Sequence, residues 1–169
     1  MISVSLISLI ISVVFNNNFL MVMSIRRTVF LPSLLDILYF NFFEENHLYW
    51  SETFNGVFFN YPYKHPHAFI IGEKYFGTII WNANNGVISD GFMNFGMLGV
   101  FINSILIALY FSFLNQLNIS SKFFGIFFLL FFVIISSSLT TVMLTHGGIL
   151  LLFVSFFILK NSQSKMNDL

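Results

Sequence analysis

The sequence contains no cysteine and little charge. Its 169 residues include seven Lys or Arg and seven Asp or Glu, which gives a formal net charge of zero. Without cysteine the chain has no disulfide, no thiolate ligand for zinc or an Fe–S cluster, and no thiol nucleophile. Without a basic cluster it cannot neutralise a run of phosphates, so nucleic acid is not an expected partner. The few charges also leave too little polar surface to cover a water-soluble globule.

Hydrophobic residues take the place of charge, at 57% of the chain, with a mean hydropathy of +0.84. The pattern predicts an all-α integral membrane protein with three to four transmembrane helices and one long extracytoplasmic loop that carries amphipathic helices. A signal peptide is the weaker interpretation of the first segment, because no basic residue precedes its apolar run. The predicted segments are a transmembrane helix at 1–23, the loop at 24–91, a transmembrane helix at 92–114, a cytoplasmic turn at 115–122, a transmembrane helix at 123–143, a short transmembrane helix at 146–159 and a cytoplasmic tail at 160–169.

Lysines in the short segments predict the orientation. Lys122 lies in the predicted turn, and Lys160 and Lys165 lie in the tail two crossings later. The positive-inside bias places both segments in the cytoplasm, so the long loop is predicted to face outward. Within this loop, apolar residues along one helical face near 32–46 predict a helix that lies in the membrane interface.

Two adjacent arginines, Arg26 and Arg27, open the loop on the side where the bias disfavours them. At a membrane face they suit a lipid-linked phosphate or diphosphate, because guanidinium binds phosphate oxygens through two parallel hydrogen bonds. The alternative is that they snorkel at the end of the first helix. Several carboxylates in the loop are candidates for a general base, and their spacing does not choose among them. These are Asp36, Glu44, Glu45, Glu52, Glu73 and Asp90.

The histidines give only weak signals. His65 and His67 flank Pro66 with no third ligand at a defined spacing, so no metal is expected, and no other cofactor. His146 precedes two glycines at the boundary of an apolar run, where it either caps a turn or provides a catalytic imidazole.

A polar stretch leads into the next apolar run, "NANNGVISDGFMNFGMLG". Its asparagines and Asp90 either hydrogen-bond sugar hydroxyls or support the fold. Gly91, Gly96 and Gly99 recur at a spacing that predicts close helix approach.

Three stretches carry a resemblance to a known family. "RRTVFLPSLLDILYFNFFEENHLYWSET", with "IGEKYFG" and "NANNGVISDGFMNFGMLG" after it, resembles the O-antigen and capsular polysaccharide polymerases of the Wzy type, which are bacterial multi-spanning glycosyltransferases. The resemblance covers about Ser24 to Val100, and the later spans match only in hydropathy. Members of the family usually have about ten or more spans, so this chain is similar to the C-terminal part. Asn41 stands where the family pattern has an acidic residue.

The resemblance implies that undecaprenyl-diphosphate-linked repeat units are polymerised at the outer face of the bacterial cytoplasmic membrane, without metal or nucleotide sugar. The expected partners are the lipid-linked glycan and the bilayer, with a flippase or chain-length regulator as a further candidate. In the implied roles Arg26 or Arg27 holds the diphosphate, Asp90 or Glu44 acts as base, and the glycan is positioned by Tyr39, Asn82 and Asn84. The alternatives are a lipid-linked glycan ligase and a non-catalytic small membrane subunit or remnant.

Overall fold

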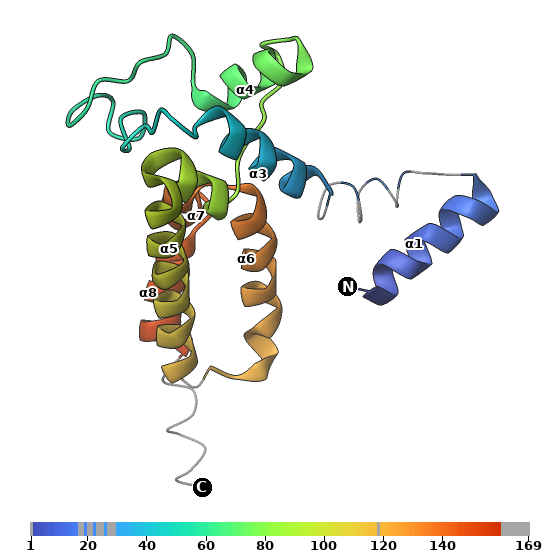
Figure 1. Cartoon of the computed structure of the whole chain (residues 1–169). Coiled ribbons are helices and arrows are strands. Elements are labelled where there is room, and N and C mark those ends of the chain that lie inside the picture. Colours follow the sequence, from blue (N-terminus) through green and yellow to red (C-terminus); the bar gives the residue numbers. More distant parts are fainter. Residues whose placement is uncertain are drawn as a thin grey trace, which may run out of the picture.

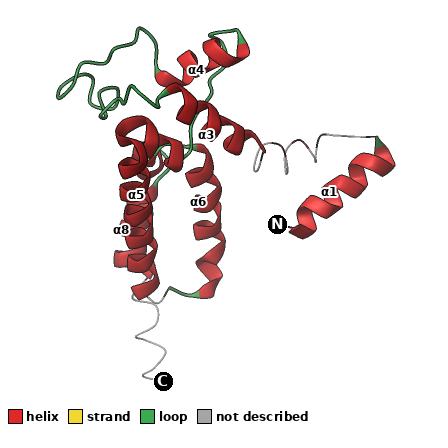
Figure 2. Cartoon of the chain, in the orientation of Figure 1, coloured by secondary structure: helices red, strands yellow, loops and turns green. Residues whose placement is uncertain are grey.

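The computed structural model describes residues 2–16, 19, 22, 26, 30–117 and 119–159, and the regular structure in these ranges is helical (Figures 1 and 2). The elements in chain order are α1 (Ile2–Phe15), α3 (Leu31–Phe42), α4 (His67–Phe76), α5 (Val87–Gln116), η2 (Ser121–Phe123), α6 (Phe124–Ser136), α7 (Leu139–Leu144), α8 (Gly148–Val154) and η3 (Ser155–Leu159). α1 stands apart from the later helices (Figure 1).

The helices from α5 onward form an elongated body of three antiparallel passes (Figure 1). α5 runs away from α3, η2 and α6 return, and α7, α8 and η3 run back again in the direction of α5. Tyr110 of α5 joins the first and last passes, because its hydroxyl donates a 2.9 Å hydrogen bond to the carbonyl of Gly148. The buried apolar residues between the passes are Val87, Tyr110, Leu114, Leu117, Leu130, Leu139 and Val142.

A polar cap, residues 31–86, covers one end of this body. α3 lies between α4 and the body, and long loops connect the two cap helices to each other and to α5 (Figure 1). Pro32 occupies the first turn of α3, where its missing N–H is harmless, and α4 ends at Gly77 in the left-handed conformation. The buried apolar residues of the cap are Leu35, Tyr39, Phe43, Leu48, Ile71 and Ala83, and Met93 of α5 completes this core.

α5 is two helices joined by a sharp break at Phe95 and Gly96, whose backbone angles are non-helical. The first part folds back on the second, since the side-chain amide of Asn103 donates to the carbonyl of Val87 over 2.9 Å. Sixteen residues of straight helix would separate these two positions by about 24 Å. At the crossing the backbones of Gly91 and Gly99 touch, and a Cβ atom on Gly91 would lie 2.5 Å from the Gly99 carbonyl oxygen. The glycines thus do allow close helix approach, and it occurs within α5 itself.

The helix boundaries differ from the sequence prediction. α1 covers 2–15 of the segment predicted at 1–23, a helix is present near 32–46 as α3, and the helix predicted at 92–114 begins earlier, at Val87. The segment predicted at 123–143 is divided, because Ser137 is extended and ends α6, so that 139–144 belongs to the next pass. The last span therefore starts before the predicted 146. The tail at 160–169 lies outside the described residues.

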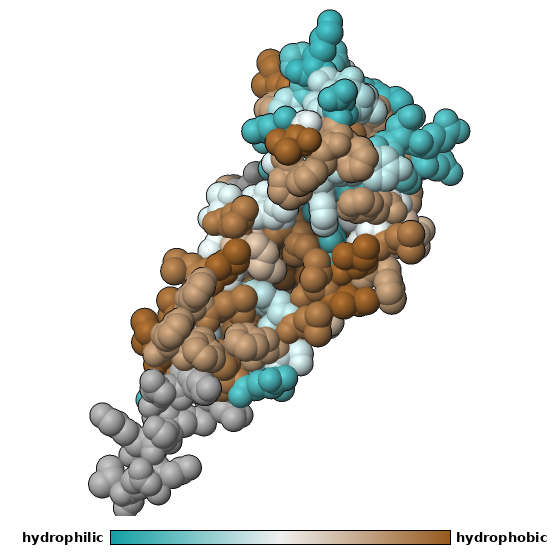
Figure 3. Space-filling view, turned by 90° about the vertical axis from the view of Figure 1, so that its left-hand side faces the viewer, coloured by the Kyte–Doolittle hydropathy of each residue, from teal (hydrophilic) through white to brown (hydrophobic). Residues whose placement is uncertain are grey.

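Polarity divides the molecule along its length (Figure 3): hydrophilic residues gather on the cap and hydrophobic residues on the body. Two stretches of the described residues are long and apolar enough to cross a membrane, Val87–Gln116 and Leu139–Leu159. Only 22% of the most apolar window of each is buried in the chain, whereas the core helix of a soluble protein is mostly buried. η2 and α6 together form a shorter apolar helix, Ser121–Ser136.

Candidate functional site

The sequence-predicted site residues fall into three groups. Arg27 lies outside the described residues. Arg26, Glu44, Asn82 and Asn84 are exposed. Tyr39 and Asp90 are buried, with exposed fractions of 0% and 3%. The structure brings only these last two into one place, the foot of the cap, where the charge of Asp90 acts on the Tyr39 hydroxyl.

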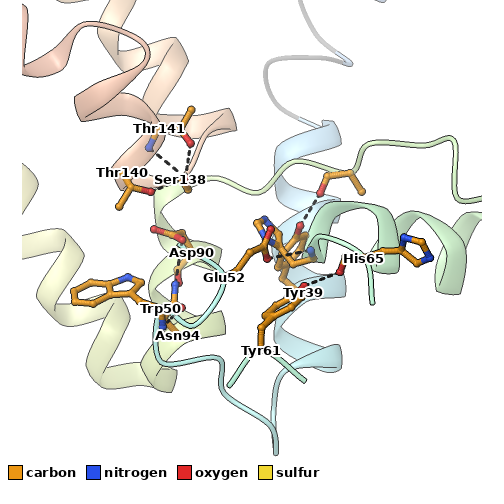
Figure 4. Close-up of polar contacts among 12 residues, drawn as sticks. Tyr39, Trp50, Glu52, Tyr61, His65, Asp90, Asn94, Ser138, Thr140 and Thr141 are labelled. Carbon is orange, nitrogen blue, oxygen red and sulfur yellow. Dashed lines mark hydrogen bonds and ion pairs between the residues drawn. The ribbon is translucent and has the colours of Figure 1, made fainter. Parts of the chain in front are cut away.

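Around them lies a cluster of polar side chains that we call the cap junction, consisting of Tyr39, Glu52, His67, Asp90 and Asn94. Figure 4 labels all of these except His67. Its members come from α3, the loop after α3, the start of α4 and the folded-back part of α5. Charges on Glu52 and Asp90 both act on Tyr39, and Asp90 and His67 also interact electrostatically. The cap junction therefore joins the cap to the first pass of the body.

Glu52 and His67 form a hydrogen-bonded pair at the start of α4. His67 Nδ1 lies 2.5 Å from Glu52 Oε2, and the backbone N–H of His67 donates to the same oxygen over 3.1 Å. Burial alone would raise the pKa of Glu52, but the hydrogen bonds and charge of His67 outweigh it and hold this pKa below its ordinary value of 4.5. Glu52 thus fixes the ring of His67 through Nδ1, and Nε2 is the nitrogen that could exchange a proton with a substrate.

Two tyrosines surround this pair. The Tyr39 hydroxyl donates to the carbonyl of Ala83 over 2.8 Å, and the Tyr61 hydroxyl donates to the carbonyl of His65 over 2.8 Å. Burial, and then the negative charge of Glu52, raise the pKa of both phenols. The tyrosines are therefore neutral hydrogen-bond donors at physiological pH, and in this structure they hold the loops on either side of α4.

Asp90 connects the folded-back part of α5 to the start of α7. Its Oδ2 accepts from the backbone N–H of Leu139 over 3.1 Å, and its Oδ1 accepts from the side-chain amide of Asn94 over 3.2 Å. Both carboxylate oxygens have partners inside the protein. A buried carboxylate held in this way stabilises the fold, and it can reach a substrate only if the first part of α5 moves.

Asn94 links Asp90 to the cap. Its amide nitrogen donates to the backbone and side chain of Asp90, and its Oδ1 accepts from the backbone N–H of Trp50 over 2.8 Å. Trp50 and the preceding Tyr49 have backbone φ angles of 57° and 51°. Large side chains seldom adopt this left-handed conformation, so Asn94 holds a strained turn of the cap against the break in α5.

Two cavities in the described part of the chain contain no residue of the cap junction in their walls. One of about 490 Å³ lies between α5 and α6 and is lined largely by phenylalanine, with Asn115, Ser120 and Ser121 at its polar edge. Another, of about 310 Å³, lies beneath α3 and has Asp36 in its wall. Asp36 Oδ1 is buried without a hydrogen-bond partner, and burial raises the pKa of this side chain.

The described residues contain no group of three His, Cys, Asp or Glu side chains that could hold a metal ion. Sequence reasoning gave Glu52 no more weight than the other carboxylates, interpreted His67 as half of a weak metal motif and did not select Asn94. The only local signal is Pro66, which precedes α4 and so places His67 in its first turn. The partner of His67 lies 15 positions earlier, and no sequence periodicity predicts such a pair.

In comparisons with known proteins, no family model, curated protein or solved structure matches this chain.

Proposed function

We propose that this chain is an integral membrane protein that takes part in the polymerisation of undecaprenyl-diphosphate-linked repeat units into a polysaccharide. The body crosses the bacterial cytoplasmic membrane in three passes, a fourth crossing is made by α1, and the cap faces outward. The support for the membrane is the apolar surface of the body, where Leu98 is 73% exposed and Phe124 is 66% exposed. Side chains of this kind in such number have no stable environment in water.

The observation that carries the proposal is the position of the cap junction. Its ionisable groups come from the two cap helices, the loop between them and the first turn of α5, which is where the polar cap meets the apolar body. This is the level at which a lipid-linked substrate changes from hydrocarbon to diphosphate and sugar. In the proposed reaction an acceptor hydroxyl attacks the sugar carbon attached to the diphosphate, the bond to the diphosphate breaks, and the proton passes to a base. The Glu52–His67 pair has the geometry of such a base.

The remaining roles follow the family resemblance. Arg26 or Arg27 holds the leaving diphosphate, because guanidinium remains charged and binds phosphate through two bonds. Tyr39, Asn82 and Asn84 position the glycan, and Asp90 or Glu44 is the base that the resemblance favours. Asp90 already has two hydrogen-bond partners, and Glu44 is exposed. The proposal therefore has two versions, which differ in the proton acceptor. The acceptor is either His67 supported by Glu52, or Asp90 after movement of α5.

The test is the length of the polysaccharide made by the native host. Deletion of the gene is expected to replace long chains by single repeat units on a gel, and Arg27→Ala is expected to behave like the deletion while the protein remains in the membrane. Lys64→Ala, which changes an exposed cation of the cap, is the control and should restore long chains. Unchanged chain length in the deletion strain would refute the proposal.

A non-catalytic membrane subunit is the second candidate. The cavity between α5 and α6 favours it, because phenylalanine contributes much of its wall and no ionisable side chain lines it. On this proposal Arg27→Ala and His67→Ala both restore long chains to the deletion strain, and only variants that disturb helix packing fail to do so.

A further inference from the structure

The loop after α3 exposes an unusual number of aromatic rings. We call residues 49–59, "YWSETFNGVFF", the aromatic loop. Outside the body, Phe58 and Val57 are 70% and 75% exposed, Phe59 is 55% exposed, and Tyr49 and Phe54 are each 43% exposed. The proposed function has no role for these side chains, and a loop surrounded by water would gain by burying them.

The rings of the aromatic loop are continuous with the apolar surface of α5. The ring centroids of Trp50 and Phe95 are 4.9 Å apart, and those of Tyr49 and Phe95 are 5.7 Å apart. From Tyr49 the contacts extend to Phe59 at 5.4 Å, and from Trp50 to Phe54 at 6.2 Å. Phe95 lies at the break, two residues before Met97, which is 69% exposed on the body.

Hydrogen bonds fix the root of the loop at this height. The backbone N–H groups of Leu48 and Tyr49 donate to the carbonyls of Met93 and Asn94, over 2.9 and 3.1 Å. Trp50 is held by the side chain of Asn94, as described above. The loop is also compact, because the N–H of Gly56 donates to the carbonyl of Ser51 over 2.8 Å. Its rings therefore keep a set position relative to the start of the second part of α5.

The chemistry of the exposed rings favours lipid as the partner. Trp and Tyr concentrate at the boundary between headgroups and acyl chains, and Phe enters the hydrocarbon below it. A sugar-binding surface combines one or two rings with several hydrogen-bonding side chains, whereas between Phe54 and Phe59 only Asn55 has a polar side chain.

We propose that the aromatic loop inserts into the headgroup boundary of the outer leaflet and so holds the cap against the bilayer beside α5. This inference rests on the membrane insertion of the body that is part of the proposed function, and it does not depend on the reaction. It gives the cap a second attachment to the membrane besides the helices that connect to it.

The two tryptophans of the chain allow a direct test. Trp50 belongs to the aromatic loop, whereas Trp81 belongs with α4, since its ring stacks on Phe76 at 5.6 Å, and α4 lies beyond α3 from the body (Figure 1). The full chain is reconstituted as Trp81→Phe, which leaves only Trp50, or as Trp50→Phe, which leaves only Trp81. The vesicles contain phosphatidylcholine whose acyl chains are brominated either near the headgroup or near the chain end. Trp50 should be quenched several-fold more than Trp81, and more by bromine near the headgroup.

Two further variants separate the possible failures. In the Trp50→Phe, Trp81→Phe background, Leu109→Trp reports on the body; if this residue is quenched and Trp50 is not, the loop proposal is wrong and the membrane insertion of the body stands. If neither is quenched, both are wrong. Replacing Phe54, Phe58 and Phe59 together by serine should reduce the quenching of Trp50 roughly twofold or more. A Trp50 that lipid does not quench but whose emission shifts on addition of an oligosaccharide would assign the surface to sugar and overturn the proposal.

Discussion

The cap and the body are held together by different interactions. In the cap, buried rings such as Tyr39 and Phe43 are accompanied by long-range polar bonds, including the Glu52–His67 pair. In the body, many phenylalanine and leucine side chains are exposed, and a smaller apolar core that includes Leu114 and Leu130 lies between the passes. The cap has the organisation of a soluble domain with its own core, whereas the body needs an apolar surrounding to complete it. The break in α5 is where these two kinds of packing meet.

The largest effect is expected from Gly91→Ala, which adds a methyl group at the crossing within α5. The new Cβ would lie 2.5 Å from a backbone oxygen of Gly99, so the two parts of the helix must separate, at a cost of about 3 kcal/mol in the free energy of unfolding. Thermal unfolding of the purified protein in detergent measures this. Gly125→Ala is the matched control, because nothing lies within 4 Å of its Cβ position; equal losses in both variants would show that α5 does not fold back.

Asn94→Ala is expected to have the second largest effect. It removes one partner of Asp90 and releases the strained turn at Trp50, which should cost about 2 kcal/mol because a buried carboxylate oxygen and a part-buried N–H lose their bonds together. Detergent unfolding and limited proteolysis of the loop would both register the change. The control Asn41→Ala, at an exposed position of α3, should leave both measurements unaltered. If Asn94→Ala had an effect as small as this control, Asn94 would not be the link between the cap and the body.

Tyr39→Phe is expected to destabilise the cap and to leave the body unchanged. It deletes the hydroxyl that donates to the Ala83 carbonyl and keeps the ring in the cap core, so about 1 kcal/mol of stability should be lost. Proteolytic cleavage should become faster in the connection between α4 and α5 and stay unchanged in the connection between α5 and α6. Hydrogen exchange, followed segment by segment, should show the same difference. Equal acceleration in both connections would mean that the cap and body unfold as one unit.

The smallest expected effect is a pH dependence confined to the cap. Because the folded-state pKa of Glu52 is lowered, its pairing with His67 stabilises the cap above pH 4.5 and this contribution is lost as the pH falls below that value. Asp36 acts with the opposite sign, since burial raises its pKa above 3.8 and protonation relieves it. In an Asp36→Asn background the melting temperature of the cap should therefore fall on acidification. Glu52→Gln should abolish this pH dependence, which corresponds to about 1 kcal/mol or less in the free energy of unfolding. A slope that persists in Glu52→Gln would assign it to another group.

Local patterns allowed much of the architecture to be predicted. The helical character, the apolar passes and α3 follow from hydropathy and from the spacing of Leu35 and Tyr39, since these depend on residues close in sequence. The division at Ser137 and the break at Gly96 were not predicted. A glycine in an apolar run is compatible with both a continuous helix and a fold-back, and only contacts such as that of Asn103 with Val87 select the second.

Prediction of the site was limited for a related reason. The run Asn82 to Asn85 appears in sequence as one polar patch, but in the extended chain its side chains alternate, with Asn82 and Asn84 exposed and Ala83 and Asn85 buried. The sequence indicated that Asp90 lies where a polar stretch enters an apolar one. It did not indicate that both carboxylate oxygens of Asp90 would accept hydrogen bonds within the protein. The pairing of Glu52 with His67 depends on how a long loop closes, which local pattern does not determine.

The division into an outward cap and a membrane-crossing body is tested most directly by labelling single cysteines in intact cells, because the chain has no cysteine of its own. Lys64 is exposed in the cap, Ser121 is exposed at the turn between α5 and α6, and Leu109 is 61% exposed on the body. A membrane-impermeant maleimide should label Lys64→Cys from outside, Ser121→Cys only after permeabilisation, and Leu109→Cys in neither condition. Labelling of Lys64→Cys and Ser121→Cys from the same side, or of Leu109→Cys from water, would contradict the account.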